Sequence, residues 1–216
     1  MIWLLFILTT SQLLGQSKYP ADSLLNSSNI SIFRKTALIP IMAWQRLSYN
    51  SKLFNCQFDP SCSNYGAVAI KQHGLIIGGI MTSDRIVRCN PFAFRYHLDS
   101  AGKFHNSHGR LIDPLHPIIS ARKPKKSPLM ASIFSALIPG SGRIYAERPM
   151  DGLMGMTTTY QFAAVAYFAK KENYPNIGYL FSIITLLVYS GEIYGSWRSA
   201  KYYQKSNNVE IIDIEN

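Results

Sequence analysis

The sequence CQFDPSCSNYGAVAIKQHG, residues 56–74, places a cysteine on either side of a proline and then changes to a helical pattern. Pro60 fixes its own backbone φ angle and disfavours a helical conformation at Asp59, so a turn is expected between the cysteines. The hydroxyl of Ser61 or Ser63 can accept hydrogen bonds from the free amides of a first helical turn. This stretch therefore predicts a turn that leads directly into a helix.

The residues after this turn predict two successive helices. The first covers residues 64–73 and ends at Gly74, because glycine is the residue most favoured just past a helix C-terminus. The second runs from about residue 75 to residue 87 and carries several apolar side chains. Its end is marked by three consecutive residues, Cys89, Asn90 and Pro91.

The three cysteines, Cys56, Cys62 and Cys89, leave four chemical interpretations open. A zinc site would need a fourth ligand, for which His73 is the nearest candidate, although paired zinc-binding cysteines usually lie closer together in the sequence. A disulfide between Cys56 and Cys62 would leave one cysteine unpaired. A nucleophilic cysteine would need a base and an oxyanion site, for which the sequence offers no matched set. Small buried thiols that pack a tight turn are the fourth interpretation.

Residues 31–50 show the spacing of apolar side chains that is typical of a helix, in which Pro40 is expected to produce a break or a kink. The pattern fits either an amphipathic helix at a membrane interface or a helix packed on the protein's own core. The candidates for contact with a membrane surface are Arg34, Lys35, Trp44 and Arg46.

The N-terminal segment, residues 1–16, is largely apolar but shorter than the roughly 20 residues that span a bilayer. Its length is typical of a signal peptide cleaved near Gly15, although no basic residue precedes the apolar run. An uncleaved N-terminal membrane anchor is the alternative. Residues 17–30 are polar and rich in turn-forming residues, and we interpret them as a linker.

The net charge of +10 is unevenly distributed over the 216 residues. Ser17 to Lys126 contain 15 Lys and Arg against 5 Asp and Glu, whereas Ser127 to Asn216 contain 7 of each. The first half is therefore expected either to attract an anionic partner such as phospholipid or to present a solvated basic surface. Nucleic acid binding is not expected, because no base-reading or stacking motif accompanies the charge.

Residues 37–117 resemble the YidD family of membrane protein insertion efficiency factors. The family has a Cys-Arg-aromatic-x-Pro-Ser-Cys-Ser-x-Tyr run, then a Lys-His-Gly and an Arg-Cys-x-Pro. Trp44-Gln45-Arg46 and Asp113-Pro114 are similar to further family motifs, whereas Gln57 stands where the family has arginine and Asp59 where an aromatic residue is usual. The matching residues are Cys56, Phe58, Pro60, Ser61, Cys62, Ser63, Tyr65, His73, Gly74, Arg85, Arg88, Cys89, Asn90 and Pro91.

The resemblance implies a small helical domain, here residues 31–119, with no catalytic activity and no cofactor. It implies a peripheral protein of the inner membrane that helps membrane proteins pass from the translocon to a YidC-type insertase. The expected partners are therefore an anionic phospholipid membrane, an insertase or translocon, and nascent membrane proteins. Residues 92–110 are longer than the family's connection and hold three histidines that form either a metal-binding loop or ordinary surface positions: His97, His105 and His108.

The second half predicts a membrane module over residues 129–200, after a basic linker at 120–128 and before a polar tail at 201–216. Two apolar runs, residues 152–169 and 177–196, have lengths that suit transmembrane helices joined as a hairpin. The module resembles small two-helix membrane proteins with a Ser-Ala-x-x-Pro-Gly-x-Gly-x-x-Tyr motif. Glu192 is either a functional intramembrane acid or an interfacial one. The motif residues singled out are Pro139, Gly140, Gly142, Tyr145 and Glu192.

Basic residues crowd the side of this hairpin that bears both of its ends, which favours a cytoplasmic location for those ends and for the YidD-like domain. A cleaved signal peptide would instead export the domain. The sequence thus predicts an all-α membrane protein that assists insertion at the cytoplasmic face of the inner membrane. The alternative is an exported envelope protein with a disulfide-stapled structural domain tethered by the hairpin.

Overall fold

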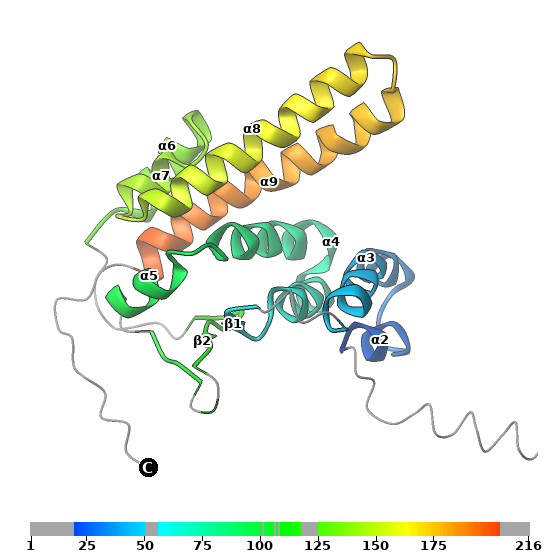
Figure 1. Cartoon of the computed structure of the whole chain (residues 1–216), viewed down its shortest axis with the longest axis horizontal. Coiled ribbons are helices and arrows are strands. Elements are labelled where there is room, and N and C mark those ends of the chain that lie inside the picture. The colour runs from blue at the N-terminus through cyan, green and yellow to red at the C-terminus, as the bar shows by residue number, and fades with distance from the viewer. Residues whose placement is uncertain are drawn as a thin grey trace, which may run out of the picture.

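The computed structural model describes residues 20–50, 56–100, 102–105, 107, 109–117 and 125–203 (Figure 1). These residues are mostly helical, so the predicted all-α class is confirmed. The expected signal peptide or anchor lies outside the described residues, as do His108, most of the basic linker and the tail beyond residue 203.

The N-terminal part of the fold is a layer formed by α2 (Pro20–Leu25), α3 (Ile32–Ser48) and the first half of α4 (Cys62–Arg88). Helix α2 lies within the segment predicted to be a linker, and that prediction is corrected here. Its support is tertiary, because the backbone N–H of Ala21 donates to the side-chain oxygen of Gln45 over 3.0 Å and Ala21 is buried.

The sequence predicted a break or a kink at Pro40, and the break does not occur, because helix α3 continues through this residue. A proline inside a helix removes one amide donor and crowds the preceding turn, which normally interrupts the helix. Packing offsets this penalty, since Leu38 and Gln45 on either side of Pro40 are fully buried against α2 and α4.

Helix α4 consists of two helical halves that meet at Gly74, as the sequence predicted. Gly74 has φ 83° and ψ 178°, a conformation that is essentially restricted to glycine. The side chain of Ser61 accepts from the backbone N–H of Asn64, which confirms the predicted N-terminal cap, and the helix ends at Cys89. The kink sends the first half toward α3 and the second half beneath α9 (Figure 1).

The turn that precedes α4 is tied to a distant loop. Its two-residue strand β1 (Phe58–Asp59) pairs in parallel with β2 (Leu111–Ile112), and the Asp59–Pro60 peptide bond is cis. In the sequence between β1 and β2, helix α5 (Ala93–Asp99) follows the end of α4. Phe58 and Leu111 are buried together with Ala93, so the turn has a small apolar core of its own.

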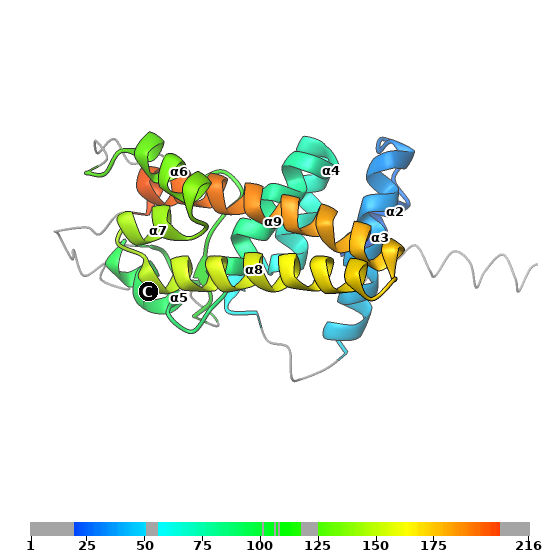
Figure 2. The same ribbon diagram turned by 90° about the horizontal axis from the view of Figure 1, so that it is seen from above.

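The C-terminal part begins with two short helices, α6 (Pro128–Leu137) and α7 (Ser141–Tyr145). Two long antiparallel helices follow, α8 (Pro149–Lys171) and α9 (Pro175–Tyr202), and they form the predicted hairpin (Figure 1). The view from above shows α9 lying across α4, with α6 and α7 beside the base of the hairpin (Figure 2).

Among the described helices, α9 alone is long and apolar enough to cross a membrane. The sequence predicted two membrane-spanning helices, whereas only α9 meets this criterion among the described helices. Helix α8 is less apolar because it contains the polar run Thr157–Thr159 and Gln161. The two halves of α9 differ in how deeply they are buried. Its second half is buried from Val188 onward at several positions, whereas large apolar side chains of its first half are exposed.

The interior of the fold contains many charged side chains. Apolar clusters are small, and the three largest fully buried side chains in the described residues are Arg85, Arg143 and Arg198. A buried arginine is costly unless it is paired and hydrogen-bonded. The pairing of these arginines is therefore central to how the elements are positioned.

Candidate functional site

Most of the residues that resemble the family motif lie in or beside two neighbouring places, while His73 and Gly74 lie at the kink of α4. One is the cysteine turn, which we define as Cys56, Ser61, Cys62, Ser63 and Cys89. The other is a buried cluster of charged side chains, which we call the ionic cluster. It includes Arg85 and Arg88. The second half of α4 connects the two, because both arginines and Cys89 lie at its C-terminal end.

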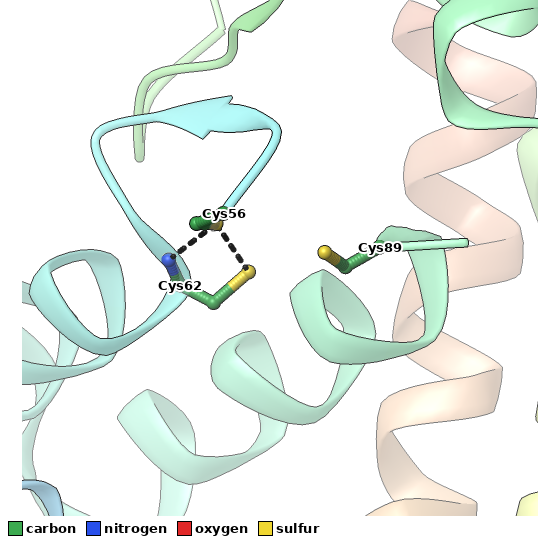
Figure 3. Close-up of side chains that lie close together, drawn as sticks. All are labelled: Cys56, Cys62 and Cys89. Carbon is green, nitrogen blue, oxygen red and sulfur yellow. Dashed lines mark hydrogen bonds between the residues drawn. The ribbon is translucent and has the colours of Figure 1, made fainter. Parts of the chain in front are cut away.

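The cysteine turn brings three sulfur atoms together (Figure 3). Cys56 and Cys62 flank the Pro60 turn, and Cys89 reaches them from the end of α4. All three Sγ atoms lie within 4.8 Å of one another, and those of Cys56 and Cys62 are 3.6 Å apart as free thiols. The hypothesis that His73 belongs to this site is wrong, since the group contains only the three cysteines among the described residues.

Polar donors surround these sulfurs. The backbone N–H of Cys62 donates to Cys56 Sγ over 3.4 Å, and Gln57 Nε2 donates to Cys89 Sγ over 3.7 Å and to the Asn90 carbonyl over 2.9 Å. Hydrogen bonds from the thiols of Cys62 and Cys89 lower the pKa of Cys56, and the same contact with Cys56 raises the pKa of Cys62. The contacts raise the pKa of Cys89 as well, so Cys56 is the most acidic of the three thiols.

A cavity of about 570 Å³ opens beside the cysteine turn, between α3 and the second half of α4. All three cysteines line this cavity, which we call the groove. Its other walls are mainly apolar, and the hydroxyls of Tyr49 and Ser61, 3.1 Å apart, supply polar groups near the sulfurs. The remaining lining residues are Pro40, Ile41, Trp44, Ser48, Ser63, Thr82 and Ile86.

The ionic cluster begins at Arg143 of α7. Its Nη2 donates to Asp84 Oδ1 over 2.8 Å, and its Nε donates to both carboxylate oxygens of Glu192 at 3.1 and 3.2 Å. All three side chains are fully buried. Arg143 thus joins α4 to α9, and Glu192 is not the interfacial acid that one interpretation of the sequence expected.

Asp113 forms the other end of the ionic cluster. It pairs with Arg85 and Arg88 of α4 and with Arg198 of α9, the last over 3.5 Å. Tyr203 just after α9 donates to it over 2.7 Å. Four groups from both halves of the chain therefore meet at one carboxylate.

Further contacts extend the ionic cluster. Arg198 donates to the Tyr65 hydroxyl and to the Pro114 carbonyl, the latter over 3.2 Å. Asn90 donates to Asp151 of α8 over 2.6 Å, and Arg148 pairs with the same carboxylate over 2.6 Å. The complete set is Arg85, Arg88, Arg143, Arg148 and Arg198 with Asp84, Asp113, Asp151 and Glu192.

The arginines hold the two central aspartates in their charged form. Burial by itself would raise the pKa of Asp113, but Arg88, Arg85 and Arg198 outweigh burial, and the pKa falls well below its usual range. The pKa of Asp84 is lowered in the same way, because Arg88, Arg143 and Arg198 overcome its burial.

The second predicted motif explains how Arg143 is positioned. Pro139 precedes Gly140, which has φ 86° and would carry a Cβ only 2.1 Å from the carbonyl oxygen of Gly152. Gly142 likewise lies against the Ala131 carbonyl, and the Tyr145 hydroxyl accepts from Ser127 N over 3.3 Å. The motif thus forms a tight turn between α6 and α8 that directs Arg143 inward.

The candidate histidines His73, His97 and His105 contact other groups of the protein. His73 lies at the α4 kink with its ring 5.6 Å from that of His116. His97 bonds to the Lys103 carbonyl over 2.7 Å, while His105 lies 3.7 Å from Asp59. No metal-binding group in the described part of the chain contains a histidine, so the hypothesis of a histidine metal loop gains no support there.

The four membrane-surface candidates all lie on α3 but have different surroundings. Arg34 donates to the Lys71 carbonyl over 2.7 Å, and Arg46 pairs with Asp22 over 3.2 Å. Trp44 is half exposed and lines the groove, while Lys35 is partly exposed.

Sequence reasoning missed most of the ionic cluster. Only two pairs show a local signal: Asp84 and Arg88 are four residues apart on one helix, and Arg148 and Asp151 are three residues apart. Arg143 lay within the quoted glycine motif but was not singled out, and Arg148, Asp151 and Arg198 were not considered as a group. Charged side chains inside an otherwise apolar module were the signal that could have found them.

Comparison with known proteins matches residues 33–99 to the YidD family model, described as "Putative membrane protein insertion efficiency factor". Curated relatives with the same description include those of Oleidesulfovibrio alaskensis, 48% identical over 60 residues, and Thermoanaerobacter pseudethanolicus, 42% identical over 59 residues. Each match covers 27% of this chain, and 67% and 86% of the respective relative. No solved structure matches the chain. The chain, through residues that include the cysteine turn and most of α4, belongs to the YidD family.

Proposed function

We propose that this protein assists the insertion of proteins into the inner membrane, without catalysing a reaction, and acts beside a YidC-type insertase. Family membership supports the role in insertion, since the family and its curated members are named for it. The observation that carries the proposal for this chain is the exposed apolar surface of the α8–α9 hairpin.

The outer part of the hairpin has the surface of a membrane-embedded element. Ile183 is 66% exposed and Phe168 is 56% exposed, although such side chains are usually buried in soluble proteins. Residues 175–187 of α9 extend over roughly 20 Å, compared with about 30 Å for the hydrocarbon core. Other exposed apolar or aromatic side chains of this part are Tyr160, Val165, Tyr167, Ile177, Tyr179, Leu180 and Leu186.

We therefore place the tip of the hairpin in the bilayer and the ionic cluster at its base, where protein covers it. Helix α3 would then lie near the same surface, because Ile32 and Phe33 are 77% and 84% exposed beside Arg34 and Lys35. Each basic residue near an anionic leaflet contributes on the order of 1 kcal/mol to membrane attraction. This arrangement agrees with the excess of basic residues in the first half of the chain.

The test uses proteoliposomes that contain a YidC-type insertase and a single-span client, with insertion measured as the protease-protected fraction. The full chain should raise that fraction, and the double variant Leu180→Asp/Ile183→Asp should abolish the increase because two charges oppose burial in lipid. Lys103→Asp, a charge change at an exposed residue outside the hairpin, serves as the control and should behave as the unmodified chain. No increase with the full chain would contradict the proposal.

The location at the cytoplasmic face is also a proposal, supported by the basic residues around both hairpin ends. The rival is an exported domain in which Cys56 and Cys62, whose sulfurs lie 3.6 Å apart as free thiols, are joined by a disulfide. Intact cells would be treated with a membrane-impermeant maleimide, with and without reductant. Labelling only after denaturing lysis supports the cytoplasmic location, and labelling from outside supports the exported protein.

A further inference from the structure

The cysteine turn gathers three sulfurs from two separate parts of the sequence. Cys89 lies 27 residues after Cys62 in the sequence, yet its sulfur completes a compact group of three within 4.8 Å. A disulfide would use two of these sulfurs and leave the third beside it. In a zinc–thiolate site with a metal–sulfur bond of about 2.3 Å, tetrahedral geometry separates the sulfurs by about 3.8 Å. The Cys56–Cys62 separation of 3.6 Å is close to this value.

The surroundings suit sulfurs that carry negative charge. The amide of Cys62, in the first turn of α4, donates to Cys56, and the side-chain amide of Gln57 donates to Cys89. The positive end of the helix dipole lies at this N-terminus. Hydrogen bonds from such outer groups commonly orient and stabilise metal ligands.

Contacts on two sides hold the backbone of the cysteine turn in place. Arg85 donates to the Pro60 carbonyl over 2.9 Å, which ties the turn to the second half of α4. Parallel pairing of Phe58 with Leu111 fixes the other side of the turn. The thiols would therefore need little rearrangement to converge on a common ligand.

We propose that the three thiolates of Cys56, Cys62 and Cys89 bind one soft metal ion of the Zn²⁺ or Cu(I) class. Thiolate ligands select such ions over the Mg²⁺ and Ca²⁺ class, which prefer oxygen. No histidine or carboxylate joins the group in the described residues, and all three cysteines line the groove. Binding releases the thiol protons to solvent, so it weakens as the pH falls.

The metal site requires reduced thiols but does not depend on the insertion activity. The metal-site proposal and the proposed function can therefore fail separately. The test uses the full chain in detergent with three free thiols verified by a thiol assay, and Cd²⁺ as the probe. One equivalent of Cd²⁺ should produce the ultraviolet cadmium–thiolate charge-transfer band in full. Zn²⁺ should then compete with Cd²⁺ for the same site and raise the melting temperature of the chain.

The variants separate a metal site from a structural thiol cluster. Cys89→Ser should reduce the band and lower Cd²⁺ affinity by more than 100-fold, whereas Gln57→Ala, which removes only an outer donor, should lower affinity about 10- to 100-fold. His73→Gln should bind as the unmodified chain does. Circular dichroism checks that each variant is helical. No band at one equivalent, or a full band that persists in helical Cys89→Ser, would overturn the proposal.

Discussion

Asp113 and Asp84 illustrate how individual side chains hold this protein together. Each carboxylate is buried among arginines that come from different helices. Removing one partner of a buried ion pair leaves an uncompensated charge in the interior and typically costs about 3–5 kcal/mol. The ionic cluster contains five arginines and four acids, so it has no spare negative charge to replace one that is lost.

Asp113→Asn should therefore lower the free energy of unfolding by about 3–5 kcal/mol. The matched control is Asp22→Asn, which removes the partner of Arg46 in a pair where Arg46 is 57% exposed. Exposed pairs contribute about 0–1 kcal/mol, so the control should be close to the unmodified chain. Denaturant unfolding in detergent measures both. Equal effects of the two substitutions would contradict the stabilising role of the ionic cluster.

The same aspartates set the response to acid. Because their pKa values are lower in the folded protein than the roughly 3.9 of an unfolded aspartate, they stabilise the fold fully above that pH. This stabilisation is lost as the pH falls further, through the folded pKa values. The melting temperature should therefore drop steeply below about pH 4. Asp113→Asn should show a shallower drop, and an unchanged slope would contradict this assignment.

At the scale of elements, the close packing of α4 against α9 depends on small side chains. A Cβ at Gly191 would lie 1.8 Å from Ser83 Oγ and 3.2 Å from the Ile80 carbonyl oxygen. Ser83 cannot turn away freely, since its hydroxyl donates to that carbonyl over 2.9 Å. The two helices therefore approach each other where Ser83 meets Gly191.

Gly191→Ala should destabilise the chain by about 1–3 kcal/mol through this overlap. Ser83→Gly alone should cost about 0.5–1 kcal/mol through its lower helix propensity. The double variant should be more stable than the sum of the two losses predicts, because the second change makes room for the first. Thermal unfolding of all four proteins gives the coupling energy. Simple additivity would show that the contact does not limit the helix separation.

The sequence allowed the turn, the Ser61 cap, the kink at Gly74 and the hairpin to be predicted, because each depends on residues close together in the chain. Helix α2 was missed because its support is the side chain of Gln45, which lies on another helix. The ionic cluster was missed for the same reason, since Arg143 and Asp84 are 59 residues apart. The three cysteines were found, but their convergence depends on the end of α4.

At the scale of the whole molecule, the ionic cluster joins the family-matched segment to the helices that follow it. Two coexpressed fragments, divided within residues 118–124, should therefore copurify in detergent. Their association should persist at about 1 M salt, because buried pairs are screened much less than exposed ones. Arg143→Ala should weaken it, whereas Lys170→Ala near the hairpin tip should not. Fragments that separate in high salt would contradict this prediction.

The contacts of Asp113 with Arg198 and Tyr203 have a practical consequence for mapping this protein in cells. They hold the last turn of α9 against the segment that pairs with the cysteine turn. A reporter fused directly after Tyr203 therefore records the compartment of the three cysteines. A single fusion experiment therefore shows whether the three thiols lie in a reducing or an oxidising compartment.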